Sequence, residues 1–192
     1  KKSLQQLGML IEVRCNTMRE GKAMIEVILV DENDMPIGRM EKLAVHQQGL
    51  LHRAISVYVF NDHNELLIQR RAAGKYHAGG QWSNTCCGHP LPGEDTQEAA
   101  MRRLYQEMGM ACALHESFEL SYCLDVGGGL TEHELAHVFI GHSNVVPQLN
   151  AEEADAFAYH PVDEILEQMQ LEPERFTPWF RLCLPKVIAH LD

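Results

Sequence analysis

The stretch from Gly74 to Met108 constrains the fold more than any other part of this 192-residue chain. Its first part, residues 74–93, is rich in Gly, Pro, His and Cys, which is typical of an irregular functional loop. Its second part, residues 94–108, carries the clearest helical pattern, with Asp95 as N-cap and Glu98 three residues later. One helix face is apolar: Ala100, Leu104 and Met108. We therefore expect a functional loop held in place by a packed helix.

Strand-like segments lie on both sides of this unit. They are bounded by turn signals and are rich in apolar and β-branched residues: 25–30, 54–60, 65–69, 116–126 and 134–141. Helices are predicted at 161–169 and 178–190, and Pro185 should kink or divide the second. The alternation predicts a mixed α/β or α+β domain over residues 24–192. Residues 1–23 lack clear periodicity and are predicted to be an N-terminal extension.

Composition narrows the functional classes. The chain is 45% hydrophobic and 22% charged, as in ordinary globular proteins. No apolar run approaches the ~20 residues of a membrane span, and the start of the chain lacks the apolar core of a signal peptide. The net charge of −11 argues against a nucleic-acid partner. Six irregularly spaced cysteines indicate reduced thiols, so we expect a cytoplasmic protein, and nothing in the sequence requires more than a monomer.

The loop contains adjacent cysteines. If residues 85–89 are extended, Cys87 and His89 share one face and Cys86 points the other way. Two small core thiols are an equally weighted alternative, because free cysteine is among the most buried residue types.

The loop and helix together resemble the Nudix box, in which carboxylates gather around magnesium and a diphosphate. The matching positions are Gly88, Glu94, Arg102, Leu104, Glu107 and Gly109. Arg103 and Gln106 stand where the box carries glutamates, which puts hydrolysis in doubt. Arg103 and Glu107 lie i,i+4 on one helix face, where they would hold a Mg²⁺–diphosphate or form an ordinary surface ion pair.

Residues 131–137 permit two interpretations. As a strand, the segment places Glu132 and Glu134 on one face, as metal ligands or as a solvated acidic edge. As a helix, it matches the HExxH motif of zinc proteases, with His133 and His137 as ligands and Glu134 as base. A triple glycine before it and an apolar β-branched run after it favour the strand.

Histidines and basic residues complete the candidate site. A five-ligand nitrogen and oxygen set suits Mg²⁺, Mn²⁺ or Zn²⁺: His46, His52, His89, Glu132 and Glu134. Positive charge suited to a diphosphate comes from Arg70, Arg71, Lys75 and Arg103, with a charged hairpin edge as the plainer explanation for Arg70.

Taken together, these residues resemble type I isopentenyl-diphosphate isomerase over residues 25–179. The motifs are Glu41-Lys42 with His46, Leu51-His52, Arg70-Arg71 with Lys75, Trp82-Ser83-Asn84, Cys87-Gly88-His89-Pro90, Tyr122, Glu132-His133-Glu134 and Thr177-Pro178-Trp179. The resemblance implies a Nudix-like mixed sheet flanked by helices. It also implies interconversion of isopentenyl and dimethylallyl diphosphate for isoprenoid biosynthesis.

The same resemblance implies a role for each residue. Cys87 and Glu134 would be the acid–base pair on opposite faces of the alkene, with Tyr122 assisting Glu134. Glu107 would hold a second Mg²⁺ with the diphosphate. The substrate would be bound by Lys42, Arg71, Lys75, Arg103 and Trp179. Alternatives are a Nudix diphosphohydrolase, a small zinc protease and a non-catalytic metal-binding domain.

Overall fold

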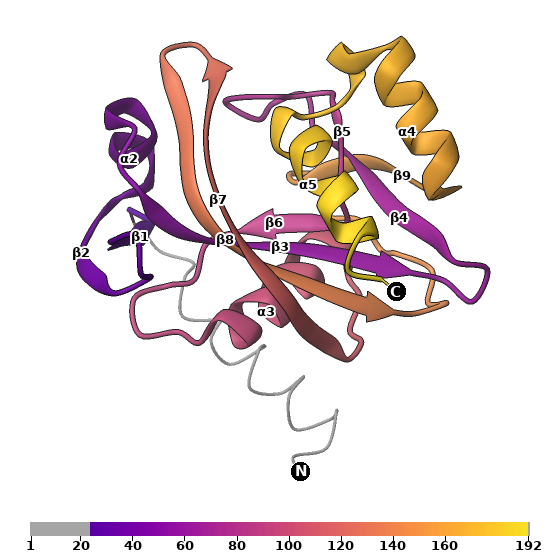
Figure 1. The fold of residues 1–192 in the computed structure, drawn as a ribbon, viewed down its shortest axis with the longest axis horizontal. Coiled ribbons are helices and arrows are strands. Elements are labelled where there is room, and N and C mark those ends of the chain that lie inside the picture. The colour runs from indigo at the N-terminus through magenta and orange to yellow at the C-terminus, as the bar shows by residue number, and fades with distance from the viewer. Residues whose placement is uncertain (1–23, 192) are drawn as a thin grey trace.

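The computed structural model describes residues 24–191, which form a nine-stranded mixed sheet with helices on both faces (Figure 1). The strands are β1 (Glu26–Val30), β2 (Pro36–Glu41), β3 (His52–Phe60), β4 (Glu65–Arg71), β5 (Trp82–Ser83), β6 (Cys86–Gly88), β7 (Leu114–Gly127), β8 (Leu130–His142) and β9 (Ala154–Pro161). The helices are α2 (Lys42–Gln48), α3 (Thr96–Met108), α4 (Val162–Leu171), a short 3-10 turn η1 (Pro173–Arg175) and α5 (Pro178–Ile188). None of these helices is long and apolar enough to cross a membrane.

Strand β3 is the centre of the sheet. Along one edge it pairs in parallel with β8, with His52 opposite Glu134. Its other partners are β1, β6 and β4, and here Ser56 lies opposite Cys87. The strands that carry Cys87 and Glu134 are therefore both hydrogen-bonded to β3, which fixes their positions relative to one another.

Both faces of β3 are covered, and its residues alternate between two hydrophobic clusters. Ala54, Tyr58 and Phe60 belong to the cluster under α4 and α5. The intervening residues 55, 57 and 59 belong to the cluster under α3. Burying each large apolar side chain contributes roughly 1.5–3 kcal/mol, so this doubly buried strand contributes strongly to the stability of the sheet.

Helix α3 is bounded by two local signals. The Asp95 side chain accepts hydrogen bonds from the backbone N–H groups of Gln97 and Glu98, at 2.9 and 3.3 Å, which confirms the predicted N-cap. The helix ends at Gly109 with φ 61°, and a Cβ atom there would lie 2.6 Å from the Gln148 carbonyl oxygen. Gly109 is thus required both by its conformation and by this close approach.

The predicted mixed fold is confirmed, with several corrections. Residues 131–137 lie in β8, so the helical HExxH interpretation is wrong. Helix α5 passes through Pro185 without dividing, because the carbonyl that loses its donor belongs to the exposed residue Arg181. Strands β2, β5 and β9 and helix α2 were not predicted, and the conditional extended segment at residues 85–89 contains β6. The expected extension, residues 1–23, lies outside the described residues.

Candidate active site

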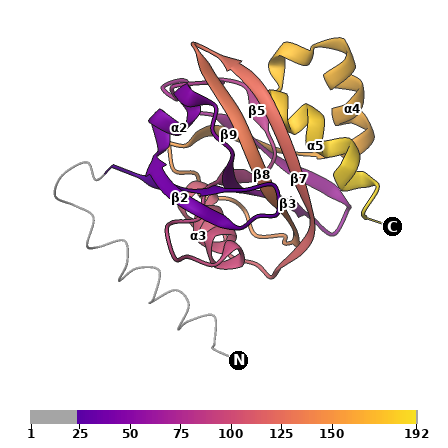
Figure 2. The same cartoon turned by 60° about the vertical axis from the view of Figure 1, so that its left-hand side comes forward.

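Five side chains from four parts of the fold meet at the predicted metal site. His46 comes from α2, His52 from β3, His89 from the turn after β6, and both glutamates from β8. One ligand atom from each lies within 4.8 Å of all the others: His46, His52, His89, Glu132 and Glu134. Figure 2 shows α2 beside the β7–β8 hairpin, and α2 contacts β8.

The histidine hydrogen bonds show that this cluster fits a cation. The Nδ1 atoms of His46 and His52 donate to the carbonyls of Lys42 and Leu50, at 2.6 and 2.8 Å. A carbonyl only accepts, so Nδ1 carries a proton in each ring, and in the neutral tautomer Nε2 carries the lone pair. His46 Nε2 is buried without a hydrogen-bond partner, and His52 Nε2 faces His89 Nε2 at 3.1 Å. A divalent ion would satisfy these inward-facing lone pairs together with the two carboxylates.

The pKa values of the cluster are shifted in different directions. Burial lowers the pKa of His46, but its contacts with Glu132 outweigh burial and raise it. Burial lowers the pKa of His89 well below its usual range, and the charge of Lys42 lowers it further, so its ring stays neutral. Burial opposes ionisation of Glu134, but contacts with Glu132, His52 and the Tyr122 hydroxyl outweigh burial and lower its pKa. Neutral imidazole and ionised carboxylate are the forms that bind metals.

Cys87 lies on the same side of β6 as the helix α5 cluster, whereas Cys86 is fully buried beneath α3. The predicted opposite orientation of the two thiols is thus confirmed. The Cys87 thiol donates to Asn84 Oδ1 at 3.2 Å and lies 3.7 Å from Ser56 Oγ. Burial raises its pKa to about 12, so the group is a neutral thiol.

Tyr122 and Glu134 are direct neighbours across the β7–β8 ladder. The Tyr122 hydroxyl donates to Glu134 Oε2 at 2.5 Å, while Glu134 Oε1 lies 2.9 Å from His89 Nε2. Each oxygen of Glu134 therefore has a different partner, one on the metal-site side and one on the aromatic side.

The four predicted substrate-binding cations converge beside the metal cluster. Burial lowers the pKa of Lys42, and the positive charges of Arg103, Lys75 and Arg71 lower it further. The Arg71 guanidinium carbon lies 5.1 Å from the centre of the Trp179 ring, and its buried Nε has no partner. A group of neighbouring cations, one of them with an unpartnered N–H, suits an anion with several oxygen atoms.

Glu107 is buried on α3 at the edge of this cationic group. It accepts from Gln69 at 2.6 Å through one oxygen and from Arg103 at 2.5 Å through the other. Arg103 and Lys75 also pair with Glu153, a residue that precedes β9. Carboxylates thus neutralise part of the positive charge of this group.

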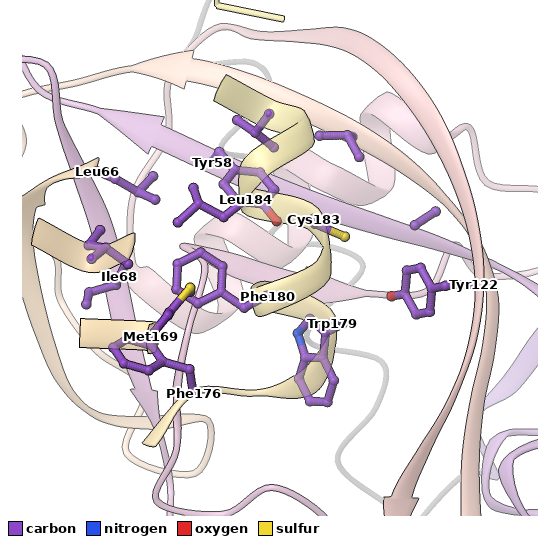
Figure 3. Close-up of a cluster of buried hydrophobic side chains, with 14 of the residues drawn as sticks. Tyr58, Leu66, Ile68, Tyr122, Met169, Phe176, Trp179, Phe180, Cys183 and Leu184 are labelled. Atoms are coloured by element: carbon purple, nitrogen blue, oxygen red, sulfur yellow. The ribbon is translucent and has the colours of Figure 1, made fainter. Parts of the chain in front are cut away.

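Trp179 forms an aromatic wall next to Cys87 and Tyr122. Its ring is 4% exposed, and its Nε1 donates to Ser83 Oγ at 3.1 Å. Figure 3 shows Trp179 and Phe180 projecting from α5 into the buried cluster, with Tyr122 entering from β7. This side of the site is apolar and closed by α5.

Residues 50–180 match the NUDIX domain family. The isopentenyl-diphosphate Delta-isomerase of Pectobacterium atrosepticum is 54% identical over 84% of this chain and 90% of its own length. The enzyme named isopentenyl-diphosphate Delta-isomerase 2 from Aromatoleum aromaticum is 49% identical, covering 85% of this chain and 87% of its own. The chain belongs to the type I isopentenyl-diphosphate isomerase family, within the Nudix superfamily.

Solved structures agree with the Nudix fold. A Deinococcus radiodurans protein superimposes with a TM-score of 0.72 at 16% identity, covering 84% of this chain and 98% of its own. The MutT protein of Methanosarcina mazei gives 0.62 at 18% identity, covering 74% and 96%. At these identities the likeness concerns the fold alone.

The two departures from the Nudix box have a visible consequence in this isopentenyl-diphosphate isomerase family member. Gln106 accepts from Arg102 and Arg103, at 3.0 and 3.2 Å, and Arg103 binds Glu107. The α3 face that would carry a carboxylate cluster is instead an arginine–amide network with one acidic member. Residue His137, the second histidine of the rejected zinc-protease motif, pairs with Glu116 at 2.5 Å on the opposite face of β8.

Sequence reasoning assigned no individual role to three residues that contact the site, although Asn84 stands in one of the family motifs. Asn84 connects the Cys87 thiol to Ser56, and donates to two backbone carbonyls. His77 lies 3.0 Å from Glu132, and Glu153 pairs with Lys75. Asn84 and His77 lie in the loop already singled out, so their place in it was an available signal. Glu153 is brought in only by the pairing of β9 with β4.

Proposed function

We propose that this protein interconverts isopentenyl diphosphate and dimethylallyl diphosphate, with Cys87 and Glu134 as the acid–base pair. The observation that carries the proposal is the placement of a protonated thiol and an ionised carboxylate on two strands flanking β3. Both groups belong to the α5 side of the sheet, where an alkene held between them would be reached from both faces.

The reaction itself needs only two proton transfers. One proton adds to the terminal carbon of the double bond and gives a tertiary carbocation, and one proton leaves from the carbon on the other side. The substrate neither gains nor loses atoms. One of the two residues ends with an extra proton and the other lacks one, so a proton must pass between them before the next turnover. Tyr122, which donates to Glu134, is placed to assist at that side.

The surroundings protect the cation from water. Trp179 is nearly fully buried, and its ring stabilises a neighbouring positive charge by a cation–π interaction of about 2 kcal/mol when desolvated. Exclusion of water by the α5 cluster prevents quenching of the carbocation.

The two β8 glutamates and three histidines would hold one metal ion, and Mn²⁺, Mg²⁺ or Zn²⁺ fits this nitrogen and oxygen donor set. Glu107 would bind a Mg²⁺ ion that accompanies the diphosphate. When bound, these ions supply positive charge that offsets the diphosphate and the carboxylates. The side chains that would bind the diphosphate are Lys42, Arg71, Lys75 and Arg103. Their binding of the diphosphate would position the small hydrocarbon group, which offers few interactions of its own.

Incubation with isopentenyl diphosphate and Mg²⁺, followed by assays for both dimethylallyl diphosphate and free phosphate, tests the proposal. We expect allylic product without phosphate. Phosphate without allylic product would overturn the isomerase assignment in favour of a Nudix diphosphohydrolase. A monomeric state and a cytoplasmic location, both expected from composition, stay predictions that sizing and localisation experiments can address.

A further inference from the structure

His77 lies between the metal cluster and the aromatic wall, in the loop that joins β4 to β5. The side chain is buried, with 8% of the residue exposed. Its ring packs edge-to-face against Trp179, with 5.6 Å between ring centres, and nearly parallel to His46 at 6.0 Å. None of the roles described above uses this residue.

One nitrogen of His77 is committed to Glu132. His77 Nε2 lies 3.0 Å from Glu132 Oε1, and the other oxygen of the same carboxylate, Oε2, lies 3.4 Å from His46 Nε2. A carboxylate only accepts, so a proton on Nε2 is the one that would face Glu132 in this ion-pair contact, while the buried Nδ1 has no hydrogen-bond partner. His77 and His46 are the basic side chains within ion-pair distance of Glu132 among the described residues.

In this geometry one oxygen of Glu132 contacts His77, and the other lies on the side of His46 and the metal ligands. Without an anchor, the carboxylate would rotate and present either oxygen to a cation. With Oε1 fixed by His77, Oε2 is held toward His46 and the other ligands. Partners of this kind orient a metal ligand without touching the metal, and losing one typically weakens metal affinity about 10–100-fold.

We propose that His77 is a positioning residue for Glu132, and that its Nε2–H sets the affinity of the five-ligand centre for a divalent cation. The inference rests on the proposed metal centre and extends it to a residue outside the ligand set. Its contact with Trp179 also joins the metal cluster to the wall that lines the alkene site.

The test replaces His77 in three ways and measures Mn²⁺ or Zn²⁺ binding by chelator competition, without substrate. His77→Gln places an amide N–H near the position of Nε2, whereas His77→Asn places its amide near Nδ1. We expect His77→Ala and His77→Asn to weaken metal binding by about 10–100-fold, and His77→Gln to recover most of the loss. If His77→Ala does not fold, the contrast between Gln and Asn still decides the question.

The control is His160→Gln, a histidine of β9 within ion-pair distance of Glu164 and outside the groups of residues that could hold a metal ion. It should leave metal affinity unchanged. Equal affinity in all the His77 variants, or equal loss in the control, overturns the role of His77. Isomerase activity of the parent is measured in the same preparation. If the parent protein is active and binds metal, and the His77 variants bind metal with the same affinity, this inference alone is overturned. If the parent neither binds metal nor isomerises the substrate, both proposals are overturned.

Discussion

Adjacent cysteines in β6 face opposite sides of the sheet, and their surroundings give them different roles. We expect Cys87→Ala to lower kcat by about 10²–10⁴-fold, because it removes one of the two proton-transfer groups. Cys86→Ala should leave kcat near that of the parent and cost on the order of 1 kcal/mol of stability, since Cys86 only fills the core under α3. Steady-state kinetics and urea unfolding check both variants. Full activity in Cys87→Ala would refute the mechanism.

Glu134 is the other half of the pair, and its replacement by glutamine keeps the shape while removing the basic oxygen. We expect Glu134→Gln to lower kcat by about 10²–10⁴-fold with the fold intact. Since Glu134 also belongs to the metal set, the metal content must be measured in the same sample. A variant that keeps its metal and its activity would contradict the assigned role.

Glu153 shows how charge at the diphosphate site is linked to stability. Burial raises its pKa, but Arg103 and Lys75 outweigh burial and hold the pKa below its ordinary value. A depressed carboxyl pKa stabilises the fold above the unfolded pKa of about 4.3 and loses that contribution as the pH falls through the folded value. We therefore expect Glu153→Gln to have a lower free energy of unfolding than the parent at pH 7. This difference in unfolding free energy should become smaller as the pH falls. Urea unfolding over a pH series measures the difference, and a difference independent of pH would contradict this assignment.

At the scale of elements, the contact of β6 with α3 sets the position of Arg103, which we propose to bind the diphosphate. A Cβ atom on Gly88 would lie 2.8 Å from Arg103 Cγ and Nε, so the arginine side chain would have to move. We expect Gly88→Ala to raise KM for isopentenyl diphosphate several-fold, because Arg103 no longer reaches the diphosphate. Gly74→Ala is the matched control, since a Cβ there meets nothing within 4 Å and its φ is not positive. Similar KM values in the two variants would argue against a role for Arg103.

The elements that sequence reasoning found are those with strong local signals. The doubly buried strand β3, the capped helix α3 and the β7–β8 pair around three glycines follow from apolar runs, a cap and a turn. Helix α2 is only seven residues long, and β2 is mostly exposed, so neither has a repeating apolar face to reveal it. Short elements of this kind are stabilised by tertiary contacts, which local patterns do not record.

The candidate site was predictable for a different reason. The meeting of His46 with Glu132 depends on the docking of α2 against β8, and the residues are far apart in sequence. Periodicity alone could not place them together, whereas the family motifs could. His77 and Glu153 were not predicted as site residues because nothing in their immediate sequence distinguishes them from ordinary loop residues.

At the scale of the whole molecule, the metal centre joins α2, β3, the turn after β6 and β8, so a bound ion ties these parts together. A ligand that binds only the folded state stabilises it by RT ln(1 + [L]/Kd), about 2.7 kcal/mol at a concentration of 100 Kd. We expect chelator treatment to lower Tm and added Mn²⁺ or Zn²⁺ to restore it. Glu132→Gln should show a much smaller response, because it removes one ligand. A parent protein whose Tm does not change on chelator treatment would contradict the proposed metal centre.

Helix α5, the last element of the described chain, closes the apolar side of the site over strands that come much earlier. On the ribosome, where synthesis proceeds at about 5–20 residues per second, every metal ligand and Cys87 emerge before Trp179 and Phe180. The nascent chain can therefore bring the metal ligands and Cys87 together while the hydrophobic face of the sheet that α5 later covers is still exposed to water. A chain stalled just short of α5 would expose this hydrophobic face of the sheet to chaperones. The water-excluding site needed by a carbocation would form only after helix α5 had docked.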